Sequence, residues 1–256
     1  MKEFRIWWAI AWPVSITLGC QVAMTMTDIA FLGYISTDYL AAASLASVWQ
    51  SIIMITLFAF GDSIRVLCSQ AKGANNLYLV GIWLQCGVFW ISLLCVPVAG
   101  LFLVTGTVLR LVKIDSNLCN LAQEFANYSI IWIWPRALFN AGNSYLQSQE
   151  IVRPQMWFAI LFVCINIGLN FVFIHGLFRW EGLGFIGSPI ATSCSMTLLA
   201  LTTYMYVIYA KLHVKTWSGW TTRSFQMCYT KDYFKQAMPV TLGRFIEVSN
   251  LELARN

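Results

Sequence analysis

The chain has 256 residues, of which 59% are hydrophobic and only 11% are charged, and its net charge is +5. An ordinary soluble domain carries about 25% charged residues, so this composition and a mean hydropathy of +0.67 exclude a soluble globular protein. We expect an all-α polytopic membrane protein, because open sheet edges leave backbone polar groups unsatisfied in lipid.

The first predicted span, from about Ile6 to Leu32, contains a single charged residue, Asp28. A charged side chain at the bilayer centre costs at least about 3 kcal/mol, and such residues mark ion or substrate paths. The polar residues that share its helical stripe are Thr17, Gln21 and Thr25. This stripe predicts a span that lines a cavity. The alternative is a carboxylate solvated at the helix end by the loop that follows, about two turns away.

Further apolar runs exceed the roughly 20 residues needed to cross a bilayer. These predicted spans are Leu40–Ser69, Leu79–Val104, Leu121–Gln147, Gln155–Leu177 and Phe185–Ala210. A seventh span is expected to begin near Phe234. We therefore predict three parts: a six-helix N-terminal lobe (residues 1–210), a basic cytoplasmic linker (211–233) and the incomplete start of a second lobe (234–256).

The distribution of Lys and Arg predicts the orientation. With the N-terminus inside, the inner segments hold Lys2, Arg5, Lys72, Arg153, Lys211, Lys215, Arg223, Lys231 and Lys235. The outer loops hold Arg110, Lys113 and Arg179. This asymmetry follows the positive-inside rule and predicts a multi-pass protein, expected in the plasma membrane, with a cytoplasmic N-terminus. The basic residues are too scattered for a nucleic-acid site.

The remaining composition argues against metal or enzyme chemistry. The eight cysteines are dispersed without a CxxC, and the two histidines, His175 and His213, are far apart. We expect small buried thiols rather than a zinc site. The sequence has no phosphate-binding GxxxxGK[ST] and no GxSxG. We predict no metal, no cofactor and no enzymatic activity.

A short internal similarity indicates a repeat. Ala11–Val14 opens the first span and Ala237–Val240 opens the seventh, each with a Pro at the third position. Six intervening spans bring both copies in from the same side, which predicts a parallel repeat. The residues from Val248 onward are too polar to complete a span, so we expect a chain that breaks off at the start of a second half.

Several motifs occur together in order along the chain. They are Pro13 with Asp28 and Gly33, the run Leu40–Ala46, Ser69-Gln70-Ala71-Lys72-Gly73-Ala74, Pro135 with Tyr145–Gln149 and Pro154, and Asn166–Asn170 with Gly184, Gly187, Ala191 and Thr192. In this order they resemble the multidrug and toxic compound extrusion (MATE) family of secondary transporters. The resemblance gives a structural role to Pro13, Gln70, Gly73, Pro135 and Pro154.

The resemblance implies the six-helix N-terminal lobe of a twelve-helix transporter, plus the start of helix seven. It implies a secondary antiporter that exports organic, often cationic, compounds or drugs in exchange for protons or sodium ions. The family pattern implies cation coupling at Asp28, Asn166, Asn170 and Thr192. Many microbial members have Asp where this chain has Asn170, so we expect protons rather than sodium ions. Many eukaryotic members have a functional Glu where this chain has Glu247.

The residues themselves agree with this resemblance. Burial penalises the charged form of a carboxylate, so Asp28 is expected to take up a proton and release it when its cavity wets. Asn166 and Asn170 are four apart and share a helical face; they serve either the cation site or the backbone of a neighbouring helix. Gln21, Thr25 and Glu247 are the predicted substrate-cavity residues.

Other charged residues also occur in the predicted spans. Asp62 and Arg65 are three apart and are expected to pair near the inner surface. Glu124 is expected near the outer end of its span, in water. Arg136 lies deeper in the same span and is harder to explain as a solvated charge.

Partners follow from these predictions. We expect an organic cation or drug-like small molecule, membrane lipid and a second lobe, supplied in another chain or by a homodimer. One alternative is a truncated, non-transporting product that associates with a full-length partner. Another is a lipid-handling protein or membrane enzyme, for which the sequence offers no catalytic pair.

Overall fold

The computed structural model describes residues 2–217, 219 and 221–253. The side chains of Lys2 and Arg5, which contribute to the predicted orientation, and residues 254–256 of the predicted third part lie outside this description. The division into lobe, linker and second-lobe start stays a prediction.

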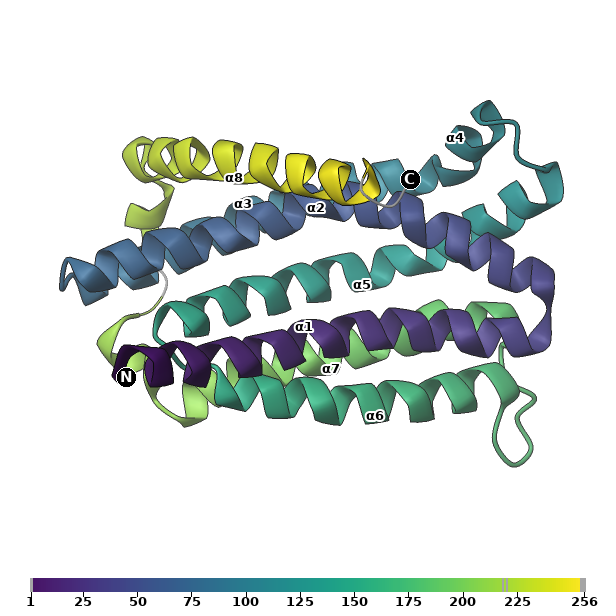
Figure 1. The fold of residues 1–256 in the computed structure, drawn as a ribbon, viewed down its shortest axis with the longest axis horizontal. Coiled ribbons are helices and arrows are strands. Elements are labelled where there is room, and N and C mark those ends of the chain that lie inside the picture. The colour runs from purple at the N-terminus through teal and green to yellow at the C-terminus, as the bar shows by residue number, and fades with distance from the viewer. Residues whose placement is uncertain (1, 218, 220, 254–256) are drawn as a thin grey trace. The chain divides into compact units, whose positions relative to one another are not determined.

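The described part of the chain is helical and contains no strand (Figure 1). The α-helices are α1 (Lys2–Ile35), α2 (Thr37–Gly73), α3 (Leu77–Leu103), α4 (Thr105–Leu111), α5 (Ser116–Ser148), α6 (Arg153–His175), α7 (Gly187–Tyr209) and α8 (Met227–Leu253). Three 3-10 turns join them: η1 (Gly184–Ile186), η2 (Leu212–Lys215) and η3 (Thr222–Phe225). The all-α prediction is confirmed.

Five stretches of helix are long and apolar enough to cross a membrane. They are Trp7–Ile35, Thr37–Gly73, Leu77–Leu103, Arg153–His175 and Gly184–Tyr209. The remaining predicted span corresponds to α5, which is long but more polar. Several of its polar side chains, among them Ser129 and Ser144, are buried in protein, so they need no lipid-compatible surface. The protein is an integral multi-pass membrane protein.

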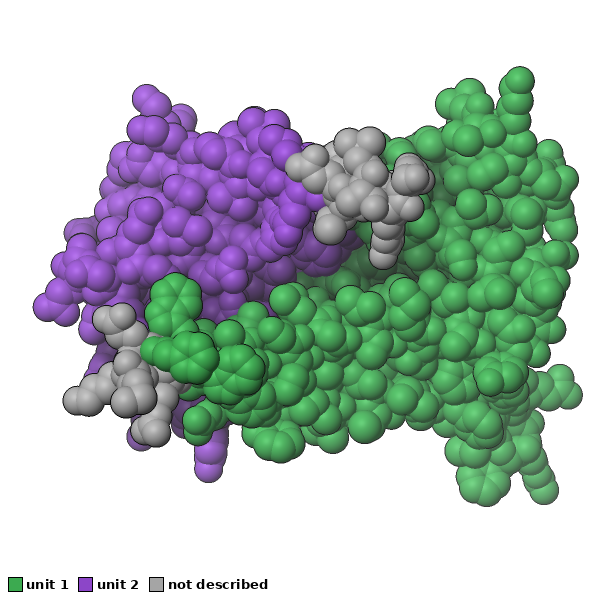
Figure 2. Space-filling view, viewed as in Figure 1, with its two compact units in different colours: residues 1–52, 97–136, 152–202 green, residues 53–96, 137–151, 203–256 purple. Residues whose placement is uncertain are grey.

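The helices divide into two compact units, coloured separately in Figure 2. Unit 1 comprises residues 1–52, 97–136 and 152–202. In this unit α1 packs along α6. A buried cluster joins the end of α1 to the start of α2, to α4, α5 and α6 and to η1; its members are Leu32, Ala42, Ala43, Ala46, Leu109, Cys119, Ala122, Phe125, Ile174 and Phe185. Small alanines here let the helix backbones approach closely.

The loop after α6 depends on a glycine. Gly176 caps α6 with φ 83°, and its N–H donates to the carbonyl of Val172 at 2.8 Å. A Cβ at this position would collide with the backbone of Trp180 and Gly182. The positive φ and the close approach both favour glycine, and they fix where α6 ends.

Unit 2 comprises residues 53–96, 137–151 and 203–256. In this unit α8 is fastened to α2 through buried Tyr233, whose hydroxyl donates to the carbonyl of Phe60 at 2.7 Å. The ring of Phe234 meets that of Phe60 edge-on, with 5.5 Å between centroids. Helix α8 begins at Met227, ahead of the predicted start near Phe234. The prediction followed the apolar residues, which begin near Phe234. The helical hydrogen bonds begin earlier and include the polar turn 227–232.

The segment between α7 and α8 is anchored within unit 2. Gln85 of α3 donates from Nε2 to the carbonyl of Gly219 at 2.6 Å, and its Oε1 accepts from the backbone N–H of Thr221 at 3.0 Å. The hydroxyls of Tyr145 and Thr216 are hydrogen-bonded at 2.5 Å. These bonds attach the predicted linker to the helices of its own unit.

Candidate functional site

The candidate site is built around Asp28, which lies within the apolar helix α1. Its side chain is 7% exposed, so the solvated-helix-end alternative does not describe it. Because α1 packs along α6, this face of α1 is closed by polar residues that come from helices distant in sequence.

Two side chains donate hydrogen bonds to the Asp28 carboxylate. The hydroxyl of Thr192, on α7, lies 2.8 Å from Oδ1 and 2.6 Å from Oδ2. The amide Nδ2 of Asn170, on α6, donates to Oδ1 at 2.9 Å. Hydrogen bonds to an ionised acceptor are shorter and stronger than neutral ones. Three helices of unit 1 are therefore joined at one carboxylate.

A second layer supports these donors. Asn166 lies one turn before Asn170 on α6 and donates from Nδ2 to the hydroxyls of Thr192 at 3.1 Å and Ser195 at 3.4 Å. Asn170 also reaches the backbone carbonyl of Asn166 at 3.0 Å and its Oδ1 at 3.3 Å. The two asparagines and Ser195 are fully buried. Their cross-helix partners are side chains, which disfavours the alternative in which they bond a neighbouring backbone.

One buried acceptor at this site lacks a donor. The Oδ1 atom of Asn170 has no hydrogen-bond partner among the described residues, although its amide nitrogen faces three acceptors. Leaving a buried polar atom unsatisfied costs about 1–3 kcal/mol.

A cation from α5 acts on the same carboxylate. Arg136 interacts electrostatically with Asp28, and its guanidinium carbon lies 5.3 Å from the centroid of the Trp132 ring. Charge interactions are strong where water is excluded, and an aromatic face also stabilises a cation. Its interactions with Asp28 and with the Trp132 ring account for a cationic side chain within a predicted membrane span.

The structure brings together all four residues predicted for cation coupling: Asp28, Asn166, Asn170 and Thr192. Their role in coupling stays a prediction. Ser195 was not predicted, although it lies three residues after Thr192 and so on the same face of α7.

The predicted cavity residues of α1 do not bond to the carboxylate. Gln21 and Thr25 are half-buried, and the Thr25 hydroxyl donates to the carbonyl of Gln21 at 3.4 Å. Buried Thr17 donates to the carbonyl of Pro13 at 2.9 Å. These bonds within the helix satisfy the hydroxyls and leave the Gln21 side chain as the larger polar group of this surface.

The motif residues lie inside helices or at their ends. Pro13 and Pro135 are inside α1 and α5, and Pro154 is in the first turn of α6, where a missing N–H costs little. Gln70 and Gly73 belong to the last turn of α2, where the carbonyl of Gln70 accepts the N–H that follows Gly73 at 3.0 Å. A Cβ at Gly73 would meet nothing within 4 Å.

Glu247 belongs to unit 2, where it forms an ion pair with Arg244 at 3.3 Å. Arg244 also binds Asp62 of α2 at 2.6 Å from its Nη2 and 3.2 Å from its Nε. The predicted pair of Asp62 with Arg65 exists at 3.4 Å, but the contact with Arg244 is shorter. The side chain of Asp62 is 13% exposed and that of Arg244 is 43% exposed. Helix α8 is therefore joined to α2 by a partly buried ion-pair network.

The sequence matches a known family and its relatives. The family model MatE matches residues 13–172. Multidrug and toxin extrusion protein 2 of Mus musculus is 31% identical over 222 residues, which cover 85% of this chain and 38% of the relative. Protein DETOXIFICATION 17 of Arabidopsis thaliana is 27% identical over 247 residues, covering 96% and 50%. The chain thus spans half or less of the length of these relatives.

Solved structures share the fold. A crystal structure of the eukaryotic MATE transporter AtDTX14 has a TM-score of 0.84 and 20% identity, covering 93% of this chain and 53% of that one. A multidrug resistance MATE family transporter in an outward-facing conformation has a TM-score of 0.80 and 20% identity, covering 94% and 52%. The predicted fold class, one lobe of a larger helical transporter fold, is confirmed.

Proposed function

Because the chain belongs to the MatE family, we propose that it forms the cation-coupling lobe of a secondary antiporter that exports organic, often cationic, compounds. The observation that carries this proposal is the buried carboxylate of Asp28, held by Thr192 and Asn170 from two other helices. A buried acid in a membrane-spanning helix is costly and marks an ion path. The names of the relatives, which describe extrusion of drugs and toxins, support transport rather than enzyme catalysis.

Asp28 supplies the chemistry of coupling. Its charged form is stabilised by two donors and by Arg136, and its neutral form is favoured by the absence of water. A conformational change that wets or dries the site shifts the balance between these forms. The carboxylate therefore binds a proton in one state of the lobe and releases it in another.

Asn170 makes protons a better coupling ion than sodium. A hard cation needs several oxygen ligands, and a second acid at this position would supply them. Asn170 instead presents its amide nitrogen to Asp28. A proton on Asp28, unlike a sodium ion, needs no further oxygen ligand from this position.

The substrate path requires a second lobe. Transporters built from repeats bind substrate at the interface of the two halves, and the chain spans half or less of its relatives. We propose that a second lobe or a second copy of this chain completes the cavity, to which Gln21, Thr25 and Glu247 contribute. We place the complex in the plasma membrane with the N-terminus in the cytoplasm, on the charge asymmetry of the loops.

The test is proton binding by the purified chain in lipid nanodiscs. Difference infrared spectroscopy, titrated above about pH 6, where exposed carboxylates stay ionised, should show the carbonyl stretch of a protonated carboxylic acid, which disappears in Asp28→Asn. The matched control is Asp38→Asn, which removes an exposed acid from the start of α2 and should leave the signal unchanged. A titrating signal that persists in Asp28→Asn would refute the assignment.

A further inference from the structure

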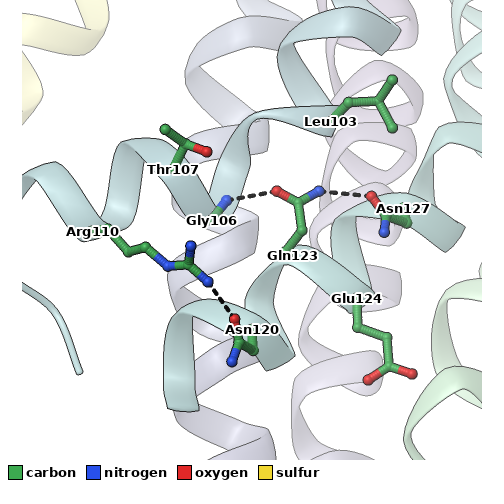
Figure 3. A pocket seen from close by; sticks show the side chains of 8 residues that line it. All are labelled: Leu103, Gly106, Thr107, Arg110, Asn120, Gln123, Glu124 and Asn127. Atoms are coloured by element: carbon green, nitrogen blue, oxygen red, sulfur yellow. Dashed lines mark hydrogen bonds between the residues drawn. The ribbon is translucent and has the colours of Figure 1, made fainter. Parts of the chain in front are cut away.

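A second polar site lies in unit 1, away from the residues that hold Asp28. A cavity of about 470 Å³ opens between α4 and the first half of α5 (Figure 3). Its lining residues are Leu103, Gly106, Thr107, Arg110, Asn120, Gln123, Glu124 and Asn127. The volume lies within the range of about 300–1,000 Å³ found for small-molecule sites. The proposed coupling function uses none of these residues.

The cavity is preformed by a side-chain clamp. Gln123 accepts the backbone N–H of Gly106 at 2.7 Å and donates to the carbonyl of Phe102 at 3.2 Å and to Asn127 Oδ1 at 2.6 Å. A Cβ at Gly106 would lie 2.9 Å from the carbonyl oxygen of Cys119 and 3.0 Å from the Gln123 Cβ. Only glycine allows α4 and α5 to approach this closely, so Gln123 ties the two helices together beside the pocket.

The pocket presents charges of both signs. Arg110 donates to Asn120 Oδ1 at 2.5 Å, which uses one of its five N–H donors. Glu124 has no hydrogen bond or ion pair within the described part of the chain and is partly buried. In Figure 3 the two charged groups lie on either side of Asn120. A ligand that complements them carries both an anionic and a cationic group.

The surroundings place this pocket at the edge of the bilayer. Helix α3 ends at Leu103, and the predicted span in α5 begins at Leu121. Large apolar side chains are exposed on both flanks of α4: Leu101, Leu103, Val104, Leu111 and Val112. Apolar exposure next to a polar, charged pocket is typical of a surface at the lipid–water interface. By the loop charges, this is the predicted outer side.

We propose that this pocket binds the headgroup of a zwitterionic phospholipid. The free N–H groups of Arg110 bind the phosphate, since a guanidinium is suited to bidentate contact with a phosphate. The Glu124 carboxylate binds the cationic amine, and the amides of Asn120 and Asn127 bind the intervening oxygens. The acyl chains then lie on the exposed apolar residues beside α4. This inference does not depend on the proposed transport activity.

The test measures lipid retention by native mass spectrometry on the purified chain. The probes are dioleoylphosphatidylcholine, dioleoylphosphatidylglycerol and dioleoylglycerol, offered at equal concentration. The unaltered chain should retain phosphatidylcholine at least about tenfold better than dioleoylglycerol, a difference that corresponds to about 1.4 kcal/mol. Soluble glycerophosphocholine should compete weakly, because it lacks the chains that contact the apolar flank.

Two variants separate the roles of the charges. Arg110→Gln should reduce phosphatidylcholine retention about tenfold. Glu124→Gln should shift the preference toward phosphatidylglycerol, because the Glu124 carboxylate no longer repels the net negative charge of this lipid. The controls are Arg179→Gln and Glu181→Gln, exposed residues of another predicted outer loop, which should change nothing.

Some outcomes would overturn the proposal. These are equal retention of all three lipids by the unaltered chain, retention in Arg110→Gln and Glu124→Gln equal to that of the unaltered chain, or an equal loss in the control variants. Tight binding of glycerophosphocholine without preference for the lipid would show that the site takes a soluble zwitterion instead. Unchanged helical circular dichroism and thermal unfolding in each variant establish that a loss does not come from misfolding.

Discussion

Replacing Asp28 by Asn should remove ion coupling while leaving the protein folded. The substitution keeps the shape of the side chain but removes its charge and its ability to bind and release a proton. Thr192 and Asn170 each donate to the carboxylate at 2.6–2.9 Å. Bonds to a charged group contribute about 1.5–3 kcal/mol, and neutral ones about 1 kcal/mol, so the two bonds together lose about 1–4 kcal/mol.

A second effect acts in the opposite direction. Burying an ion costs several kcal/mol in a protein interior, and the uncharged amide of the variant would not carry that cost. We therefore expect the free energy of unfolding of Asp28→Asn to stay within about 2 kcal/mol of the unaltered chain. Membrane insertion should be unchanged, whereas the response to a pH gradient should vanish entirely.

The assay uses the chain fused in frame to the second lobe of a relative and reconstituted in liposomes. Export of a fluorescent organic cation is followed with and without an imposed pH gradient, in Asp28→Asn and in the control Asp38→Asn. The control should export at the unaltered rate, because Asp38 is exposed. Gradient-driven export at the normal rate in Asp28→Asn would show that another group carries the coupling.

Three further outcomes are expected. In the same fusion, transport should follow a pH gradient in sodium-free vesicles, and Asn170→Asp, which adds a second carboxylate beside Asp28, should confer sodium sensitivity; strict sodium dependence of the unaltered fusion would contradict this. The unfused chain should not export a fluorescent cation from an efflux-deficient host, and export by a reconstituted monomer would refute the need for a second lobe. A double-mutant cycle on unfolding should give a coupling of about 1 kcal/mol for Arg244 with Asp62, because the Asp62 carboxylate is largely buried and accepts two hydrogen bonds, and about 0–0.5 kcal/mol for the control pair Lys72 with Glu150, whose carboxylate is exposed; equal values for the two pairs would exclude a special role for the α2–α8 contact.

Sequence reasoning could find the site because its signals are local. A lone acid in an apolar run is costly wherever the helix packs, so Asp28 stands out without a structure. Asn166 and Asn170 can be recognised from the sequence because their four-residue spacing puts both on one helical face. The ordered motifs then connect these two helices with Thr192, which no local pattern distinguishes from the other hydroxyls of α7.

The features that the sequence did not predict depend on distant contacts. Asp62 has a basic residue three positions later, which led to the pair with Arg65, but its shorter contact is to Arg244, far along the chain. The polarity of α5 is tolerated because other helices cover it, and hydropathy alone cannot show that cover. Likewise, the start of α8 follows backbone hydrogen bonds rather than apolar composition, so the predicted boundary came late.

The anchored connection between α7 and α8 has a mechanical consequence. Gln85 binds Gly219 and Thr221, and Tyr145 binds Thr216, so these three residues of the connection are tied to α3 and α5. A pull on the beginning of α8 would strain the bonds to α3 before it could stretch the connecting backbone. A displacement of the beginning of α8 is therefore transmitted to α3 through the hydrogen bonds of Gln85.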